Sequence, residues 1–79
     1  MISIVLVTYN QIEYTKLCIE SIRKYTCTIP YEIIVVDNNS QDNTIQWLSN
    51  QSDIRLIVNK ENLGFPVASN QGANEALGD

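Results

Sequence analysis

The sequence predicts an α/β fold in which three parallel strands alternate with three helices. Short aliphatic runs occur three times, and each is followed by polar residues and then by a segment with helical character. Two of the expected strands, residues 2–7 and 31–36, contain a continuous aliphatic run (4–7 and 33–36), which is typical of parallel strands that are covered on both faces. Parallel strands joined by helices have right-handed crossovers. We therefore expect one half-Rossmann unit, β-α-β-α-β-α, over residues 1–79.

The first half of the chain supplies two strands and a helix. Residues 2–7 form the first strand, which ends at polar residues. Asn10 is placed to cap a helix over residues 11–25, and Glu13, three residues later, completes a capping box. The less polar side chains of this helix recur at helical spacing, namely Thr15, Cys18, Ile19, Ile22 and Tyr25. Pro30 then breaks the chain before the second strand.

The second half continues the alternation. Ser40 is expected to cap a short helix over residues 43–50, and residues 54–58 form the third strand. Pro66 suits the first turn of a third helix, which is built from small residues. Gly72 inside that helix is less favourable than alanine by about 1 kcal/mol. We therefore expect a close packing contact or a ligand contact at Gly72.

Composition and charge exclude several classes of protein. Hydrophobic residues make up 44% of the 79 residues and charged residues 18%, a balance that excludes a disordered chain. The net charge is −4 without a basic cluster, so we expect no binding to nucleic acid. The aliphatic runs are far shorter than the roughly 20 apolar residues of a membrane-spanning helix. Cys18 and Cys27 are too few for a disulfide scaffold and suit reduced thiols, which predicts a cytoplasmic protein.

Several kinds of site are excluded as well. The sequence contains no histidine, so it cannot build a histidine-based triad, and two cysteines cannot build a structural zinc site. It has no G-x-G-x-x-G after the first strand and no G-x-x-x-x-G-K motif, which argues against dinucleotide-binding and P-loop proteins. These absences favour a nucleotide site built from carboxylate and amide groups.

The candidate site follows from the predicted topology, because ligands of open parallel sheets bind at the carboxyl ends of the strands. That rule selects residues 8–10, 37–40 and 59–64, which we expect to converge on one edge. Two roles are open for Asp37. It can accept from a ribose hydroxyl or a pyrimidine N–H, or it can bond the backbone amides of the next turn. Tyr9 can stack on a base or pack on the neighbouring loop.

Four further residues have a second interpretation beside a ligand contact. Asn10 is first a helix cap. Asn62 and Gly64 have the pattern of a tight turn before a helix, although a glycine there also permits close approach by phosphate. Asn70 lies within the third helix, where the alternative is an exposed polar position without a function.

Four segments, in order and covering nearly the whole chain, closely resemble the start of the family-2 nucleotide-sugar glycosyltransferases with the GT-A fold. They are SIVLVTYN (3–10), CIESI (18–22), EIIVVDNNSQDNT (32–44), and NLGF with ASNQG (62–72). The resemblance implies a nucleotide-diphosphate sugar, such as a UDP-, GDP- or dTDP-sugar, as donor. It also implies inverting transfer of the sugar to an acceptor hydroxyl, and it is nearest to bacterial enzymes of polysaccharide biosynthesis.

Carried over residue by residue, the resemblance places Thr8 and Tyr9 at the nucleobase and Asp37 on the base or ribose. The nucleoside-binding set that it implies is Thr8, Tyr9, Asn10, Asp37, Asn38, Asn62, Gly64 and Asn70. These residues would bind the nucleoside and take no part in bond making. Ser69 stands where the tightest matches carry arginine, so a cationic contact of some relatives is missing here.

The resemblance also sets limits. In the family, an acidic D-x-D metal motif and the carboxylate general base follow the segment equivalent to residues 1–79. We therefore expect Mg²⁺ or Mn²⁺ in a full-length parent, no cofactor within this chain, and no turnover by the isolated chain. A non-catalytic half-Rossmann module and a nucleotidyltransferase stay open as alternatives, although the nucleotidyltransferase loop rich in glycine and basic residues is missing after Val7. An uncovered sheet edge or apolar face would favour homo-oligomers.

Overall fold

The computed structural model describes residues 2–26 and 28–76 and confirms the expected order of strands and helices. In chain order the elements are β1 (Ile2–Thr8), α1 (Ile12–Tyr25), β2 (Tyr31–Asp37), α2 (Thr44–Ser49), β3 (Ile54–Val58) and α3 (Phe65–Glu75). β1 and β2 each extend one residue beyond the expected end, and α2 is shorter at both ends than expected.

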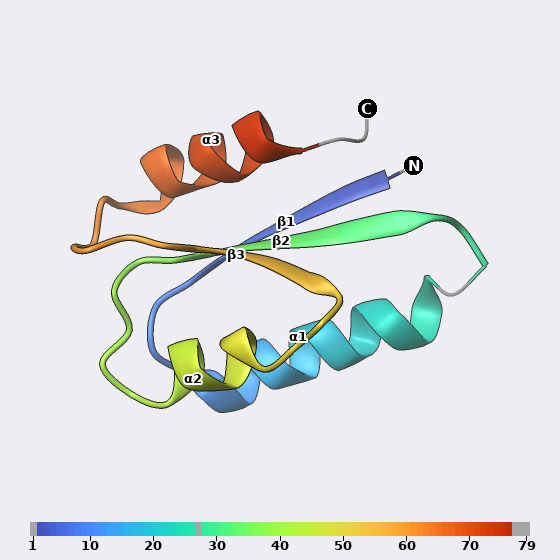
Figure 1. Cartoon of the computed structure of the whole chain (residues 1–79), viewed down its shortest axis with the longest axis horizontal. Coiled ribbons are helices and arrows are strands. Elements are labelled where there is room, and N and C mark those ends of the chain that lie inside the picture. The colour runs from blue at the N-terminus through green and yellow to red at the C-terminus, as the bar shows by residue number, and fades with distance from the viewer. Residues whose placement is uncertain (1, 27, 77–79) are drawn as a thin grey trace.

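The three strands form one parallel sheet in the order β1-β2-β3. Val35 in the central strand lies opposite Leu6 of β1 on one side and opposite Leu56 of β3 on the other. Figure 1 shows α3 on one face of this sheet and α1 with α2 on the opposite face. The half-Rossmann arrangement is therefore confirmed, and all three strands finish at the same end of the molecule.

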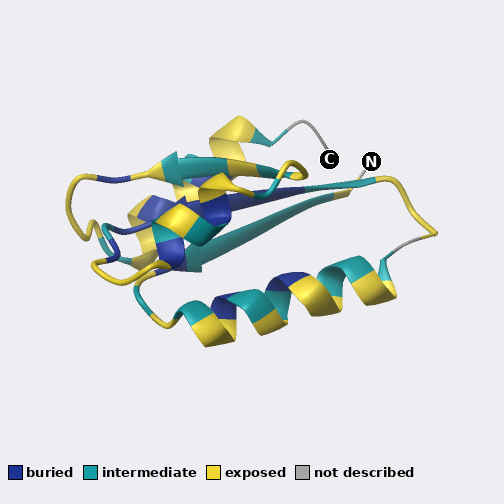
Figure 2. Ribbon diagram, turned by 60° about the horizontal axis from the view of Figure 1, so that its bottom comes forward, coloured by how far each residue is buried: buried dark blue, intermediate teal, exposed yellow. Residues whose placement is uncertain are grey.

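The hydrophobic core is centred on β2. Residues 33–36 are at most 1% exposed, and Ile19 of α1 and Leu48 of α2 pack against this strand from one side. Figure 2 shows buried residues in dark blue in the middle of the sheet and intermediate residues in teal along the strands beside them. β1 is less buried than expected: α3 packs on it at Gly72 and α1 contacts it at Thr8, but residues 3–7 are half-buried, whereas residues 33–36 of β2 are buried.

The start of α1 differs from the expected capping box between Asn10 and Glu13. Gln11 is the N-cap residue, and no side chain caps the helix. Asn10 and Gln11 both have φ of 56°, so the chain enters α1 through a left-handed turn. The Asn10 side chain is used elsewhere, since its Oδ1 accepts from the backbone N–H of Gln41 at 2.8 Å.

Ser40 does not cap α2. The helix begins at Thr44, and its N-cap residue Asn43 makes no side-chain cap bond. Asp42 instead accepts from the backbone N–H of Thr44 at 2.9 Å and from its hydroxyl at 2.5 Å. Ser40 lies too far ahead of the helix to cap it, and both of its donors bond Asp37.

The approach to α3 and its packing follow the expectations. Gly64 precedes the helix with φ of 82°, and its N–H donates to Oδ1 of Asn62 at 2.9 Å, which confirms the tight turn. A Cβ added at Gly72 would lie 2.3 Å from Cγ1 of Val5 and 3.3 Å from Cγ2 of Val36. Close packing of α3 on the sheet therefore accounts for this glycine.

Two further expectations concern the cysteines and the membrane. Cys18 carries a free thiol, and Cys27 lies outside the described residues. None of the helices in the described part of the chain has the length and hydropathy needed to cross a bilayer.

Candidate functional site

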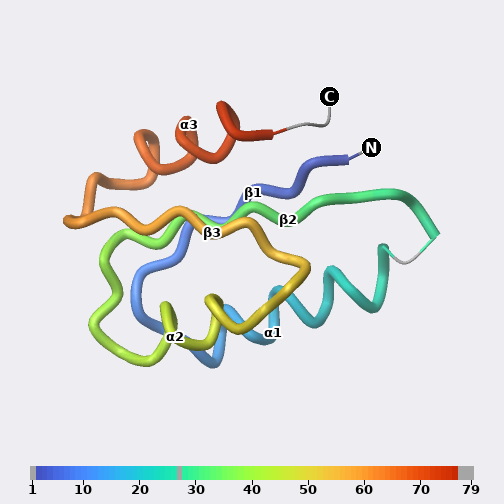
Figure 3. Tube along the Cα trace, viewed as in Figure 1, coloured from blue at the N-terminus to red at the C-terminus, as the bar shows by residue number. Residues whose placement is uncertain are grey.

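Polar side chains are buried at the end of the molecule where the three strands finish. Figure 3 shows the loops that follow β1, β2 and β3 gathered at this end, which we call the rim (residues 8–11, 37–44 and 59–64). The buried polar residues of the described chain lie in the rim or beside it: Thr8, Thr15, Asp37, Asn38, Ser40, Thr44 and Asn59. Burial of polar groups is unfavourable without hydrogen bonds. Within the described residues, no buried side-chain nitrogen or oxygen lacks a partner.

Asp37 is at the centre of the rim and is fully buried. One carboxylate oxygen accepts from the backbone N–H of Ser40 and the other from its hydroxyl, each at 2.7 Å. Of the two roles open for Asp37, the structure displays the bonds of the strand-end turn. A direct contact between Asp37 and a nucleoside stays a prediction.

Thr8 and Tyr9 occupy the end of β1 in different ways. The Thr8 hydroxyl is buried and lies 2.7 Å from the hydroxyl of Thr15 in α1. The next side chain, Tyr9, is 46% exposed. Adjacent residues of an extended segment point to opposite sides. Thr8 therefore joins β1 to α1, and Tyr9 presents its ring to the solvent.

Asn38 belongs to a network of amide groups that joins β2, β3 and α3. Its Oδ1 accepts from Nδ2 of Asn59 at 2.9 Å, and its Nδ2 donates to the carbonyl of Gly64 at 3.5 Å. Asn59 and Gln71 exchange two side-chain hydrogen bonds of 2.8 and 2.9 Å. This network connects the start and the middle of α3 to the ends of the two strands.

The structure brings some of the predicted site residues together and separates others. Gly64 contacts Asn38 through its carbonyl, whereas Asn62 is exposed and bonds within its own turn. Asn70 is exposed on α3, as in the alternative interpretation of that residue, and its neighbour Gln71 makes the contact to the rim.

Sequence reasoning gave Asn59 no individual role, missed Gln71 and misjudged Ser40. The strand-end rule selected residues 59–64, and Asn59, the first residue after β3, lies in the rim as that rule predicts. Gln71 carried no such signal, since an amide in a helix is exposed as often as not. Its contact depends on how α3 is rotated on the sheet, which the close approach at Gly72 determines.

A cavity of about 410 Å³ runs beside β1 and reaches the rim at Thr8 and Tyr9. Its walls come from β1, from α1 and from the start of α3, and the lining residues are Val5, Leu6, Val7, Thr8, Tyr9, Gln11, Tyr14, Thr15, Cys18 and Phe65. Three of its lining residues are aromatic, Tyr9, Tyr14 and Phe65, and each is at least 46% exposed, so the cavity is open to solvent. This volume and this mostly apolar lining are typical of small-molecule sites.

The described residues do not fit a metal ion. No group of three His, Cys, Asp or Glu side chains within residues 2–26 and 28–76 could hold one. The Asp37 carboxylate accepts from Ser40, and the Thr44 hydroxyl and N–H bond Asp42 and lower the pKa of its carboxyl. Asp37 and Asp42 are therefore engaged within their own loop, and the third carboxylate of the rim, Glu61, is exposed and forms no metal-binding group with them. The Mg²⁺ or Mn²⁺ expected for a parent enzyme has no binding site among these groups.

A solved structure with the same fold is the mannosyltransferase PcManGT from Pyrobaculum calidifontis, determined in complex with GDP-Man and Mn²⁺. The match has a TM-score of 0.79 and 24% sequence identity, and it covers 95% of this chain and 24% of that one. The likeness confirms the GT-A fold that the sequence predicted.

The chain is also similar to curated proteins. It is 35% identical to YfnE and 39% identical to YwdF, two uncharacterised glycosyltransferases of Bacillus subtilis, and 28% identical to the glycosyltransferase AglE of Haloferax volcanii. The alignments cover at least 98% of this chain but only 20%, 29% and 27% of those relatives.

The chain thus spans less than a third of the length of each of these relatives. The model of the family "Glycosyl transferase family 2" matches residues 3–79, which is nearly the entire chain. On this match, the chain belongs to glycosyl transferase family 2.

Proposed function

We propose that this chain forms the nucleoside-binding part of a glycosyltransferase. The enzyme would use a nucleotide-diphosphate sugar as donor and transfer the sugar to an acceptor hydroxyl with inversion. The observation that carries the proposal is the aromatic cavity that opens at Thr8 and Tyr9, where the strands of the sheet finish. Membership of the family and the position of ligand sites in open α/β sheets support it.

The cavity suits a nucleoside because it combines flat rings with hydrogen-bonding groups. Tyr9, Tyr14 and Phe65 supply aromatic rings on which a base can stack, and Gln11 and Thr8 supply polar atoms. Gly64, at the start of α3, lies at the same end and would edge the site. In this proposal the chain binds and orients the donor, and it contributes no group to the chemical step.

The proposal includes a divalent metal in a full-length parent. The solved neighbour was determined with Mn²⁺ and GDP-Man, which supports a metal-bound nucleotide sugar. The carboxylate ligands of this metal would come from outside the described residues, because no group of His, Cys, Asp and Glu side chains among those residues could hold an ion. The metal would neutralise charge on the departing diphosphate.

Titration of the ¹⁵N-labelled chain with UDP, GDP and dTDP tests the binding role. We expect shifts at residues 8–11 and around Phe65, with an affinity on the order of millimolar, or about 4 kcal/mol. Tyr9→Ala should weaken binding about fivefold or more, since loss of base stacking is worth roughly 1–3 kcal/mol. Tyr25→Ala, which removes an exposed tyrosine at the far end of α1, is the matched control. Shifts confined to other surfaces, or equal effects of both variants, would contradict the proposal.

We also propose that the chain associates with itself along β1. This strand is an edge of the sheet, and Tyr14 and Phe65 beside it are 66% and 67% exposed. Open strand edges and apolar side chains favour association. Sedimentation at several concentrations should show species larger than the monomer, and a monomer at every concentration would disprove the association.

A further inference from the structure

The turn between β1 and α1 has an unfavourable backbone conformation. Asn10 and Gln11, two consecutive residues with side chains, both have φ of 56°. Left-handed conformations are disfavoured for residues other than glycine and persist only where the surroundings hold them. This turn carries Tyr9 and Gln11, two of the residues that line the cavity.

Two hydrogen bonds shorter than 3 Å join this turn to the loop after β2, beside a longer bond of 3.5 Å from the Thr44 hydroxyl to the Asn10 carbonyl. The backbone N–H of Asn10 donates to Oγ of Ser40 at 2.7 Å. In the opposite direction, the backbone N–H of Gln41 donates to Oδ1 of Asn10 at 2.8 Å. The two loops are about 30 residues apart in the sequence, so both bonds depend on the tertiary structure.

Asp37 orients the Ser40 hydroxyl. A serine hydroxyl has one proton to donate and two lone pairs with which to accept. The Ser40 hydroxyl donates its proton to the Asp37 carboxylate at 2.7 Å, which fixes the hydroxyl with its lone pairs available to the N–H of Asn10. A second bond of 2.7 Å, from the Ser40 N–H to the other Asp37 oxygen, fixes the position of Ser40.

We propose that Asp37 and Ser40 are positioning residues for the nucleoside cavity. Buried Asp37 orients Ser40, Ser40 holds the left-handed turn at Asn10 and Gln11, and the turn places the Tyr9 ring at the cavity. Asp37 thus supports the position of Tyr9 through the loop, in addition to the direct contact with a nucleoside that the resemblance predicts for it. The effect of the turn on nucleoside binding rests on the proposed function, whereas the role of Ser40 in holding the turn does not.

Ser40→Ala tests the turn. We expect the chemical shifts of Asn10 and Gln11 to leave the left-handed range and the Asn10 amide to exchange faster with solvent. The loss of a hydrogen bond should weaken UDP binding about fivefold to tenfold. Ser49→Ala is the matched control, because Ser49 is exposed in α2 and bonds only the carbonyl of Ile45 in its own helix. It should change neither the turn nor the affinity.

A rescue variant separates positioning from a general loss of stability. Glycine adopts positive φ without a steric penalty, so Gln11→Gly added to Ser40→Ala should restore the left-handed shift of Asn10. Because Gln11 lines the cavity, this variant tests the turn alone, and UDP affinity is compared between Ser40→Ala and Ser40→Thr. Ser40→Thr keeps the hydroxyl and should resemble the parent chain.

The outcomes are distinguishable. If the parent chain does not bind UDP, GDP or dTDP, the proposed function fails. The chemical shifts of Asn10 and Gln11 in Ser40→Ala then still test whether Ser40 holds the turn. If Ser40→Ala keeps the left-handed shifts and the slow exchange of the Asn10 amide, the positioning role is disproved. If the turn changes but UDP affinity does not, the link from the turn to the cavity is disproved.

Discussion

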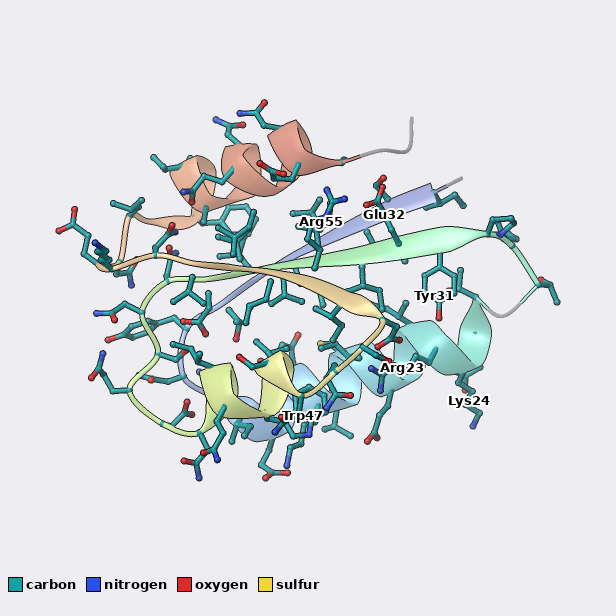
Figure 4. The ribbon with its side chains drawn as sticks, viewed as in Figure 1. Arg23, Lys24, Tyr31, Glu32, Trp47 and Arg55 are labelled. Carbon is teal, nitrogen blue, oxygen red and sulfur yellow. The ribbon has the colours of Figure 1, made fainter. Side chains whose placement is uncertain are left out.

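The two ends of the sheet are held together by different kinds of contact. At the carboxyl end, buried side chains bond one another across three loops, with Asp37 as the buried charge. The amino end carries two exposed ion pairs, in which Arg23 lies 2.6 Å from Asp53 and Arg55 lies 3.8 Å from Glu75. The half-buried hydroxyl of Ser3 also donates to Glu32 there, at 2.7 Å. Figure 4 shows Arg23 and Arg55 toward the end where the strands begin.

This difference indicates which end has a precise geometry. An exposed ion pair can exchange its partner for water at small cost, typically about 0–1 kcal/mol. A buried polar group that loses its partner costs about 1–3 kcal/mol, so the buried contacts restrict the loops to one arrangement. The rim therefore has the preorganised contacts that a binding site needs. The exposed ion pairs at the amino end do not restrict its geometry in this way.

Asp37→Ala should have the largest effect and tests the contrast directly. It leaves the buried N–H and hydroxyl of Ser40 without an acceptor, and we expect a loss of about 3 kcal/mol in the free energy of unfolding. Asp53→Ala, which removes a carboxylate from an exposed ion pair, is the matched control and should cost less than about 1 kcal/mol. Urea denaturation of both variants provides the comparison. Equal losses would remove the distinction between the two ends.

Gly72→Val should lower the free energy of unfolding by about 2 kcal/mol, because the new side chain collides with Val5 and Val36 beneath α3. The expected displacement of α3 also separates Gln71 from Asn59, so this change reaches the rim without altering a rim residue. Ala73→Val places the same side chain on the exposed side of the helix and is the control. Denaturation curves and the side-chain amide signals of Asn59 report both effects. A variant with undisturbed amide signals would show that the rim is independent of α3.

Asn59→Ala should cost about 1.5 kcal/mol, since Asn38 loses a donor and Gln71 loses both bonds to Asn59. Asn74→Ala, at an exposed position of α3, should be close to neutral. The free energy of unfolding from urea titration measures the difference. Similar values for the two variants would mean that the amide network contributes nothing to the precision of the rim.

Arg23→Gln at the amino end should have the smallest effect, less than about 1 kcal/mol at neutral pH. Hydrogen bonds from Arg23 hold the pKa of the Asp53 carboxyl below its ordinary value of 3.8. A lowered pKa in the folded state means that the stabilisation is present above the unfolded pKa and is lost as the pH falls through the folded pKa.

The difference in the free energy of unfolding between the parent chain and Arg23→Gln should therefore disappear on acidification below about pH 4. Denaturation at pH 7 and pH 3 measures it, and added salt should reduce it at pH 7. A difference that persists at pH 3 would show that Arg23 acts through packing or through its bond to Gln51.

The sequence was a reliable guide wherever one local rule decided the structure. Short aliphatic segments predicted the three strands, and β3 begins and ends as expected. The roles of Gly64 and Gly72 were predicted correctly, because few residues other than glycine fit a positive φ or a close contact between a helix and a sheet. The strand-end rule selected Thr8, Asp37 and Asn38, all of which lie in the rim.

Capping was predicted less well. Asn10 and Ser40 have the side chains of helix caps, but in the structure they bond each other's loops. Such a side chain can bond the first turn of a helix or another backbone group nearby. Which bond forms depends on the groups that the tertiary structure brings within reach. The same reason explains why Asn70 is exposed and Gln71, one position later, contacts Asn59.

By itself, the sequence determined the order of the elements, the parallel sheet and the end of the sheet at which polar residues gather. These properties depend on hydrophobic period and on residues adjacent in the chain. Tertiary structure decided which atoms bond across the rim, that β1 is an edge with a cavity beside it, and that Asp37 faces Ser40. A hydrogen bond needs its donor and acceptor within about 3 Å and in line. Partners about 30 residues apart reach that geometry only when the strands have paired and the helices have packed.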